Sequence, residues 1–412
     1  MPAPIRWSAA TLLCGAVLSQ SFALAATYVG VDLYALQAPT GLPNFSALDA
    51  FGGQVGGRAA MPLSDNFHAI LWSGPSGIPI DLTPTGSVTA RVSGLVAGQQ
   101  VGSYTPEVTL GTFGPHAAIW SGTRASLVDL NPNSELTTSV AIATDGSHQV
   151  GYVAAIMSPG PRLTRAALWA GSAASVVDLN PARSSQSQAN AVRDGQEAGQ
   201  AATGTGNHAI LWSGTAASAV DLNPAGADSS FALGVGGGQQ VGVANFPGFS
   251  SHAALWSGTP GSFVDLTPPG SANTVFSEAL DVRGGVQVGF VQVGSFDHAY
   301  LWTGAATSAV DLQLLLPANL EDSRALSIDA AGNIFGLADD TSGHVHAVEW
   351  SPVPEPSTLV LFIAGIGVLG LARREVRIVS SAADRLRMRP LTAEHSQAQQ
   401  PDPCQKQEPA AA

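Results

Sequence analysis

Charged residues are scarce in this chain, and cysteine and lysine are almost absent. Only 11% of its 412 residues are Asp, Glu, Lys or Arg, and the single lysine is Lys406. The two cysteines, Cys14 and Cys404, lie close to the two ends. The body of the chain therefore has no disulfide framework and must be held together by packing.

Basic charge is especially rare in the body of the chain. Residues 27–372 contain 9 Arg, no Lys and 25 acidic residues, a net charge of −16. Such a surface repels phosphate backbones and offers no basic patch, so we expect no nucleic-acid binding.

Familiar catalytic signatures are missing as well. Gly-x-Ser-x-Gly, His-Glu-x-x-His, a phosphate-binding Gly loop and a core Cys nucleophile do not occur. We therefore assign no catalytic residue, no cofactor and no metal ligand.

The N-terminus has the pattern of a secretory signal peptide. One Arg in "MPAPIRW" precedes an apolar stretch, and "ALAA" at 23–26 offers a small-x-small cleavage site. Residues 1–26 are predicted to be removed, with cleavage after Ala25 or Ala26. Leu13 stands where a lipoprotein site needs a small residue, so lipidation of Cys14 is disfavoured.

A second apolar stretch lies near the C-terminus. Residues 357–372, "STLVLFIAGIGVLGLA", carry no charge and are followed by Arg373 and Arg374. As a helix, these 16 residues span roughly 24 Å, which is shorter than the ~30 Å hydrocarbon core of a membrane. Local thinning of the membrane and arginine side chains that reach to its surface compensate for the difference. We expect a transmembrane helix with the Arg pair cytoplasmic, the alternative being a buried core helix. Residues 375–412 are predicted to be disordered.

Tryptophan recurs at a steady interval between these ends. The residues are Trp72, Trp120, Trp169, Trp212, Trp256, Trp302 and Trp350, spaced by 48, 49, 43, 44, 46 and 48 residues. Each follows a version of His-Ala-x-Leu-Trp, and Asp-Leu begins nine residues after each of the first six. Three segments precede the next Trp: a short run of the type Ser-x-Ala, a Gly-rich turn and a second run of the type Gln-Val-Gly. Two short runs joined by such a turn are typical of a β-hairpin.

One unit of about 46 residues thus holds four short strands, which is typical of a propeller blade. The last Trp has no Asp-Leu after it, but "TYVGVDL" at 27–33 supplies that strand before the first Trp. We predict an all-β, seven-bladed β-propeller over residues 27–351, closed by this N-terminal strand as a clasp. The Asp-Leu strand would be outermost and the Ser-x-Ala strand innermost.

This architecture makes the repeated His, Trp and Asp structural. In "HAILW", His68, Ile70 and Trp72 point to one face of the strand and Ala69 and Leu71 to the other. Equivalent histidines on neighbouring blades lie too far apart to share one metal ion, and Arg165 replaces His in the third repeat. We expect the Trp to fill the layers between blades and the His to pair with backbone or Asp.

Two resemblances to known families follow from these motifs. The repeat of His-Ala-x-Leu-Trp, Asp-Leu, Ser-x-Ala and Val-Gly over 27–351 resembles the HAF family of extracellular bacterial repeats. That resemblance implies an architecture and a location rather than an activity.

The segment "VPEPSTLVLFIAGIGVLGLARR" at 353–374 resembles the PEP-CTERM sorting signal. We assign the sorting signal to residues 352–374. Its motif residues are Val353, Pro354, Glu355 and Pro356, and Arg373 and Arg374 follow the predicted helix at 357–372. The resemblance implies a Gram-negative host, anchoring in the inner membrane, and recognition by an exosortase that cleaves near Pro354–Pro356. It also implies a link to exopolysaccharide and biofilm matrix. The 38 residues after Arg374 depart from the family pattern.

The leading hypothesis is a non-catalytic surface or secreted propeller that binds extracellular polysaccharide or builds its matrix. The aromatic residues expected to be free for a glycan are Tyr28, Tyr34, Tyr104, Tyr152 and the Phe of 245–251. A spacer without ligand is a variant of this hypothesis. The alternative is an extracellular hydrolase or lyase with its site in loops at the axial mouth, where 155–165 and 320–324 are the most irregular inserts.

Overall fold

The computed structural model describes residues 28–42, 44–61, 66–73, 77–107, 114–132, 137–155, 163–248, 250–270 and 276–353. The predicted signal peptide, the membrane helix at 357–372 and the tail at 375–412 lie outside these ranges. Within the ranges, no helix combines the length and apolarity that crossing a membrane requires.

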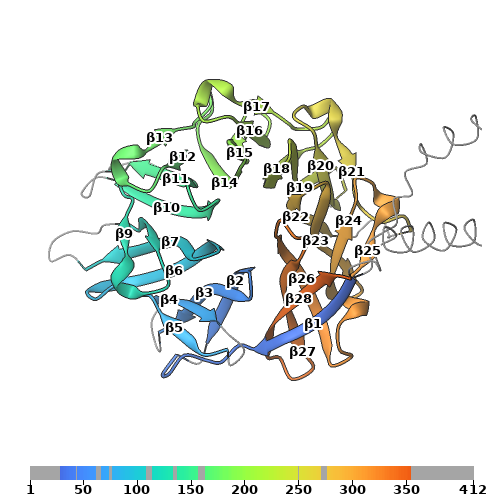
Figure 1. Cartoon of the computed structure of the whole chain (residues 1–412). Helices are drawn as coiled ribbons and strands as arrows, with labels where there is room; N and C mark the ends of the chain where they lie inside the picture. The colour runs from blue at the N-terminus through green and yellow to red at the C-terminus, as the bar shows by residue number, and fades with distance from the viewer. Residues whose placement is uncertain are drawn as a thin grey trace, which may run out of the picture. The chain divides into compact units, whose positions relative to one another are not determined.

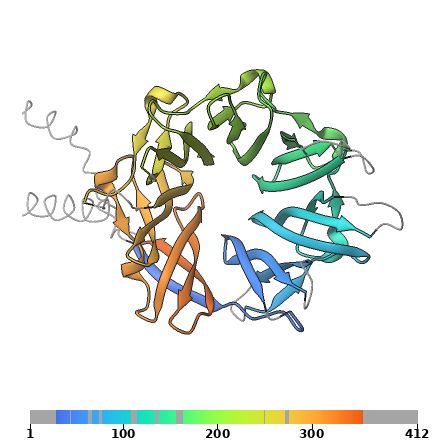
Figure 2. The same ribbon diagram turned by 180° about the vertical axis from the view of Figure 1, so that it is seen from behind.

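The described residues form seven four-stranded antiparallel sheets placed around a ring (Figures 1 and 2). The prediction of an all-β, seven-bladed propeller is confirmed. From the axis outward, blade 1 contains β2 (Phe45–Phe51), β3 (Gln54–Ala60), β4 (Phe67–Ser73) and β5 (Pro79–Asp81). Blade 2 contains β6 (Ser87–Val96), β7 (Gln99–Pro106), β8 (His116–Trp120) and β9 (Val128–Asp129). Blade 3 contains β10 (Thr137–Thr144), β11 (Gln149–Ala155), β12 (Thr164–Trp169) and β13 (Val177–Asp178).

The next three blades repeat the same order. Blade 4 contains β14 (Ser187–Arg193), β15 (Gln196–Ala202), β16 (Asn207–Trp212) and β17 (Val220–Asp221). Blade 5 contains β18 (Ser229–Gly236), β19 (Gln239–Phe246), β20 (Ser250–Trp256) and β21 (Val264–Asp265). Blade 6 contains β22 (Ser277–Arg283), β23 (Val286–Val293), β24 (Phe296–Trp302) and β25 (Val310–Asp311). Short 3-10 turns follow the Trp strands of blades 2 to 6 and strand β25: η1 (Arg124–Ser126), η2 (Ala173–Ser175), η3 (Ala216–Ser218), η4 (Pro260–Ser262), η5 (Ala306–Ser308) and η6 (Gln313–Leu315).

Blade 7 is built from both ends of the propeller. Its three inner strands are β26 (Leu320–Ile328), β27 (Ile334–Asp340) and β28 (Val345–Pro352), and its outermost strand is β1 (Tyr28–Ala35). Strand β1 pairs antiparallel with β28, so that Tyr28 lies opposite Pro352. The predicted clasp strand is thus observed, and it provides the hydrogen-bonding partner that β28 would otherwise lack.

The core is divided into seven apolar clusters, one at each interface between blades. All seven repeat Trp side chains are fully buried, and each packs against the preceding blade. Trp120 of blade 2, for example, packs with Ala69, Leu71 and Leu82 of blade 1, while Ile70 and Trp72 belong to the opposite interface. Burying an aromatic of this size at every interface supplies much of the hydrophobic stabilisation that joins blade to blade.

The glycine of the Val-Gly phrase is required by close approach of two strands. A Cβ placed on Gly242 of β19 would lie 1.9 Å from the carbonyl oxygen of Phe231 on β18. The other six blades place a glycine in the same position, with a carbonyl oxygen within about 2 Å: Gly57, Gly102, Gly151, Gly199, Gly289 and Gly336. No side chain fits there without separating the innermost strand from its neighbour.

We predict that Gly242→Ala destabilises the propeller by about 2 kcal/mol or more, because β18 and β19 must move apart. Thermal unfolding measures the change. The matched control is Gly261→Ala in η4, where a Cβ meets no atom within 4 Å. Equal melting temperatures for the two variants would contradict this account of the Val-Gly glycine.

Candidate functional site

The repeated histidines pair with the repeated aspartates of their own blade. His68 Nδ1 on β4 lies 2.9 Å from Asp81 Oδ2 on β5, and blades 2, 4, 5 and 6 repeat this contact. In blade 3, Arg165 Nε replaces the imidazole and lies 2.8 Å from Asp178. In blade 7 the clasp supplies the carboxylate, because His346 Nδ1 contacts Asp32 of β1 at 3.0 Å. Each pair joins the third strand to the outermost strand.

The same carboxylates begin a hydrogen-bond chain that reaches the next blade. Asp129 Oδ1 accepts the amide of Asn131 at 2.7 Å, and Asn131 Oδ1 accepts the hydroxyl of Ser139 on β10 at 2.7 Å. The backbone N–H of Ala117 on β8 in turn donates to Ser139 Oγ at 2.9 Å. Asn180 with Ser187 and Asn223 with Ser230 repeat the arrangement. The repeat His, Asp and Ser are therefore engaged in holding the blades together.

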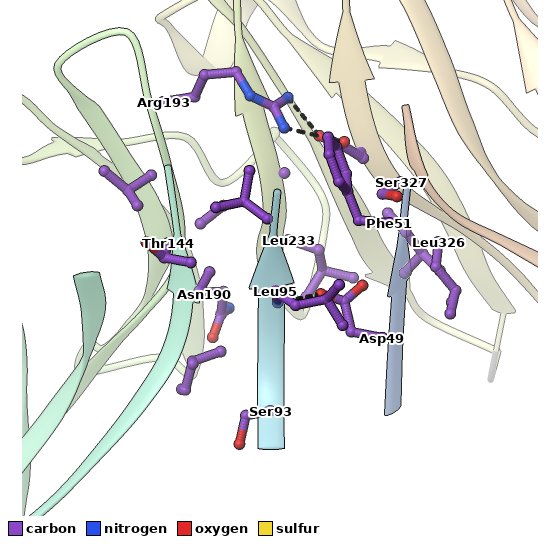
Figure 3. Close-up of a pocket in the computed structure, with 18 of the residues that line it drawn as sticks. Asp49, Phe51, Ser93, Leu95, Thr144, Asn190, Arg193, Leu233, Leu326 and Ser327 are labelled. Atoms are coloured by element: carbon purple, nitrogen blue, oxygen red, sulfur yellow. Dashed lines mark hydrogen bonds and ion pairs between the residues drawn. The ribbon is translucent and has the colours of Figure 1, made fainter. Parts of the chain in front are cut away.

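Bulges in the innermost strands form an axial cavity. Every innermost strand has a register shift at the residue after an Ala or Val, and the extra residue lines the axial cavity. The cavity measures about 370 Å³ (Figure 3). The seven extra residues that line it are Leu48, Ser93, Ile142, Asn190, Leu233, Leu280 and Leu326. The wall is thus mainly aliphatic.

Asp49 of β2 is a half-buried carboxylate in this wall. Its Oδ2 accepts the backbone N–H of Leu95 in blade 2 at 2.9 Å (Figure 3). Its Oδ1 accepts the N–H of Ala50 at 2.9 Å. Burial raises the pKa of Asp49 to about 7, the negative charge of Asp281 acts in the same direction, and the two N–H donors oppose it. Asp49 therefore exchanges a proton near neutral pH.

Arg193 of β14 and Asp281 of β22 form an ion pair that spans a whole blade. Arg193 Nη1 lies 2.7 Å from Asp281 Oδ1, and Nη2 lies 3.2 Å from Oδ2 (Figure 3). Blade 5 lies between them and presents Gly236, where a Cβ would be 3.4 Å from Arg193 Nη1. Asp281 Oδ2 also accepts the N–H of Ile328 in blade 7 at 3.1 Å. The pair thus connects blades 4, 6 and 7 around the axis.

Sequence reasoning missed both Asp49 and the Arg193–Asp281 ion pair of the axial cavity. The signal was present as departures from the repeat, since only two of the seven copies have Asp two residues after the Ala or Val that precedes the bulge: Asp49 and Asp281. Among the described residues, no three His, Cys, Asp or Glu side chains are grouped so as to hold a metal ion. The cavity offers one proton-exchanging carboxylate and one ion pair in an aliphatic wall.

The aromatic residues expected to be free for a glycan are mostly occupied. Tyr28 and Tyr34 are only 9% and 8% exposed, because β1 is packed into the closing interface, so the prediction was wrong for both. Tyr104 donates to Asp129 at 3.0 Å, and Phe246 of the 245–251 segment packs against Phe263. Tyr152 is half-buried and lines a second cavity.

The two segments proposed for an enzyme site have different outcomes. Of 155–165, residues 156–162 lie outside the described part of the chain. The segment 320–324 is not a loop but the start of β26, where its irregularity is a bulge between Leu320 and Asp322. Leu320 is buried, which anchors the strand there.

The residues of the predicted sorting and cleavage sites lie almost entirely outside the described ranges. Val353 is the last described residue. Beyond the described part are the signal-cleavage residues Ala25 and Ala26 and the motif residues Pro354, Glu355, Pro356, Arg373 and Arg374.

Comparison with known proteins identifies the C-terminal segment. Residues 352–377 match the family model of the PEP-CTERM protein-sorting motif. This motif implies export, membrane anchoring and then exosortase cleavage. No curated protein matches the chain, and the HAF resemblance stays a prediction.

Solved structures resemble the propeller. The β-propeller domain of the Trilobed protease from Pyrococcus furiosus has a TM-score of 0.51 at 7% identity, over 74% of this chain and 95% of that one. An oligogalacturonate lyase in complex with manganese has a TM-score of 0.46 at 12% identity, over 80% of this chain and 99% of that one. The oligogalacturonate lyase of Vibrio parahaemolyticus has a TM-score of 0.42 at 11% identity, over 80% of this chain and 99% of that one. At these identities the similarity concerns the fold alone.

We predict that Arg193→Gln lowers the free energy of unfolding by about 2 kcal/mol, because the Asp281 carboxylate stays buried without its partner. Arg165→Gln should cost less than about 1 kcal/mol, since that pair is exposed. The side chains of the first pair are 21% and 11% exposed, those of the second 56% and 50%. Denaturant unfolding measures both, and a larger loss for Arg165→Gln would refute the assignment.

The raised pKa of Asp49 predicts a pH dependence of stability. An unfolded Asp has a pKa near 3.9, so between about pH 4 and pH 7 the folded state binds more protons than the unfolded state. The contribution of Asp49 to stability is therefore lost as pH rises through this window. Asp49→Asn keeps an oxygen acceptor for Leu95 and does not titrate, so its stability relative to wild type should increase from about pH 5 to about pH 8. Parallel unfolding curves would show that Asp49 titrates normally.

Proposed function

We propose that this protein is an exported, exosortase-sorted propeller that acts without catalysis as a binding or structural module of the exopolysaccharide or biofilm matrix. Its place would be the cell surface or extracellular space of a Gram-negative bacterium, after a stage of anchoring in the inner membrane. The observation that carries the proposal is the PEP-CTERM match at 352–377, which begins where β28 ends at Pro352.

The side-chain chemistry of the propeller supports a binding role. The repeat histidines have Nδ1 tied to Asp, and both oxygens of Asp49 accept backbone N–H groups. A catalytic acid or nucleophile needs an oxygen or nitrogen directed at the reacting atom. At the axis, the oxygens of Asp49 are instead directed at backbone N–H groups, and Arg193 and Asp281 are directed at each other.

An extracellular hydrolase or lyase is the second candidate, and one observation favours it. Asp49 has a pKa of about 7 in a cavity of about 370 Å³, which is the protonation behaviour of a general acid or base. Screening against polysaccharides with Asp49→Asn as control separates the two functions. Turnover by wild type that is lost in the variant would establish the enzyme and overturn the non-catalytic role.

Sorting is tested by measuring the mass of the mature protein in its host. We predict a C-terminus near Pro354–Pro356 and a loss of all later residues. The variants Pro354→Ala and Glu355→Ala should stay in the membrane at the uncleaved mass, because the recognition motif is altered. Ser351→Ala, one residue before the matched segment, is the control and should be cleaved normally. A full-length wild-type protein in a host with an active exosortase would contradict exosortase sorting.

A further inference from the structure

A second cavity, of about 340 Å³, lies between blades 1, 2 and 3, away from the axis. It is located toward the ends of the strands that are joined by the β3–β4 and β7–β8 hairpins. Ligand pockets commonly measure about 300–1,000 Å³, so this one suits a small ligand or one unit of a polymer. Its lining residues are Arg58, Phe67, Thr89, Ala90, Arg91, Ser103, Thr105, Pro115, Val140 and Tyr152.

The two arginines of this cavity differ from most others in the protein. Four arginines in the described residues form ion pairs with aspartate: Arg124, Arg165, Arg193 and Arg324. Arg58 and Arg91 form none within the described part of the chain, although the chain carries a net charge of −13. The Nε atom of each is buried without a hydrogen-bond partner there. Arg58 and Arg91 therefore line one cavity, and no carboxylate of the described residues pairs with either guanidinium group.

The remaining walls combine apolar rings with hydroxyl groups. The Arg58 guanidinium lies over the Phe67 ring, 4.2 Å from its centre, and Tyr152 contributes a second ring. Ser103 and Thr105 contribute hydroxyls from β7. Thr89 is already used, because its Oγ1 accepts the N–H of Phe67 at 2.9 Å. Rings to pack on a pyranose, hydroxyls and two planar donors are the groups that recognise a sugar carrying a carboxylate.

We propose that this cavity binds a uronic acid unit of an acidic polysaccharide, with the sugar carboxylate between Arg58 and Arg91 and the pyranose against Phe67 and Tyr152. The proposal rests on the proposed function in that the ligand belongs to the extracellular matrix. It adds the site, the ligand class and the residues that select it.

The charge distribution at the same end of the blades supports this placement. Blades 6 and 7 carry Asp297, Asp322 and Asp339 near the equivalent hairpins, against the single cation Arg324. Burial and the charge of Asp297 raise the pKa of Asp322, and burial and Asp322 raise that of Asp339. An anionic polymer is repelled from that side of the ring, so blades 1 to 3 are where it meets positive charge.

The test is calorimetric titration of the full-length protein in detergent with two trisaccharides of the same linkage. One is β-1,4-linked triglucuronate and the other is cellotriose, which has neutral hydroxymethyl groups in place of the carboxylates. We expect triglucuronate to bind at least about 10-fold more tightly, and more weakly at high salt, because the selectivity depends on charge-assisted hydrogen bonds. Equal affinities for the two sugars would overturn the proposal.

Variants assign the binding to the cavity. Arg58→Gln and Arg91→Gln should each weaken triglucuronate binding by about 10-fold or more, whereas Arg283→Gln of β22, which does not line the cavity, should leave it unchanged. Arg58→Lys keeps the charge but loses the planar fork and should fall between wild type and Arg58→Gln. Unaltered melting temperatures establish that the variants are folded. Undiminished binding by folded Arg58→Gln and Arg91→Gln would refute the site.

Two further comparisons distinguish this site from a general anion site and from a failure of the sorting proposal. Inorganic sulfate that binds as tightly as triglucuronate would reduce the cavity to a general anion site and overturn the sugar assignment. If triglucuronate does not bind but the mature protein is cleaved near Glu355 and retained by the matrix, only this inference fails. If triglucuronate binds and cleavage does not occur, the sorting proposal fails and this one stands.

Discussion

Ring closure is the constraint on which the rest of this propeller depends. Each blade presents a Trp to the blade before it and a Leu-lined face to the blade after it, so the first and last blades are incomplete until they meet. Strand β1 resolves this by joining blade 7, and Asp32 takes the place of the missing repeat aspartate opposite His346. The pair is separated by more than 300 residues of sequence yet repeats the contact that other blades make within a single hairpin.

The architecture could be predicted because each blade repeats the same four strands with the same key residues. Seven Trp at a period near 46 residues and an invariant interval to Asp-Leu require a repeated hairpin, and an Asp-Leu strand before the first Trp requires a closed ring. The sequence left open whether the repeat His pairs with backbone or with Asp, and the structure shows Asp as the partner. Tyr28 and Tyr34 were misjudged because the partner of β1 is the far end of the chain, so its burial cannot be inferred from its own neighbourhood.

The axial cavity and the arginine cavity could not be predicted in the same way. Both depend on residues that occur once or twice among seven copies, and a single sequence does not show which departures meet in space. Arg193 and Asp281 are 88 residues apart and are separated by a blade, which passes beneath Arg193 at Gly236. Arg58 and Arg91 face one cavity because β3 and β6 are the second and first strands of neighbouring blades. The residues common to the blades build the scaffold, whereas both cavities are lined in part by residues that depart from the repeat.

The pairing of Tyr28 with Pro352 also has a kinetic consequence. A chain that crosses a membrane from its N-terminus delivers β1 first and β28 last, so β1 must wait unpaired while six blades emerge. Contacts of such long sequence separation form slowly because the loop entropy is lost before they do. We therefore expect the pairing of β1 with β28, beside the first residue of the sorting motif, to be the last contact of the ring to form.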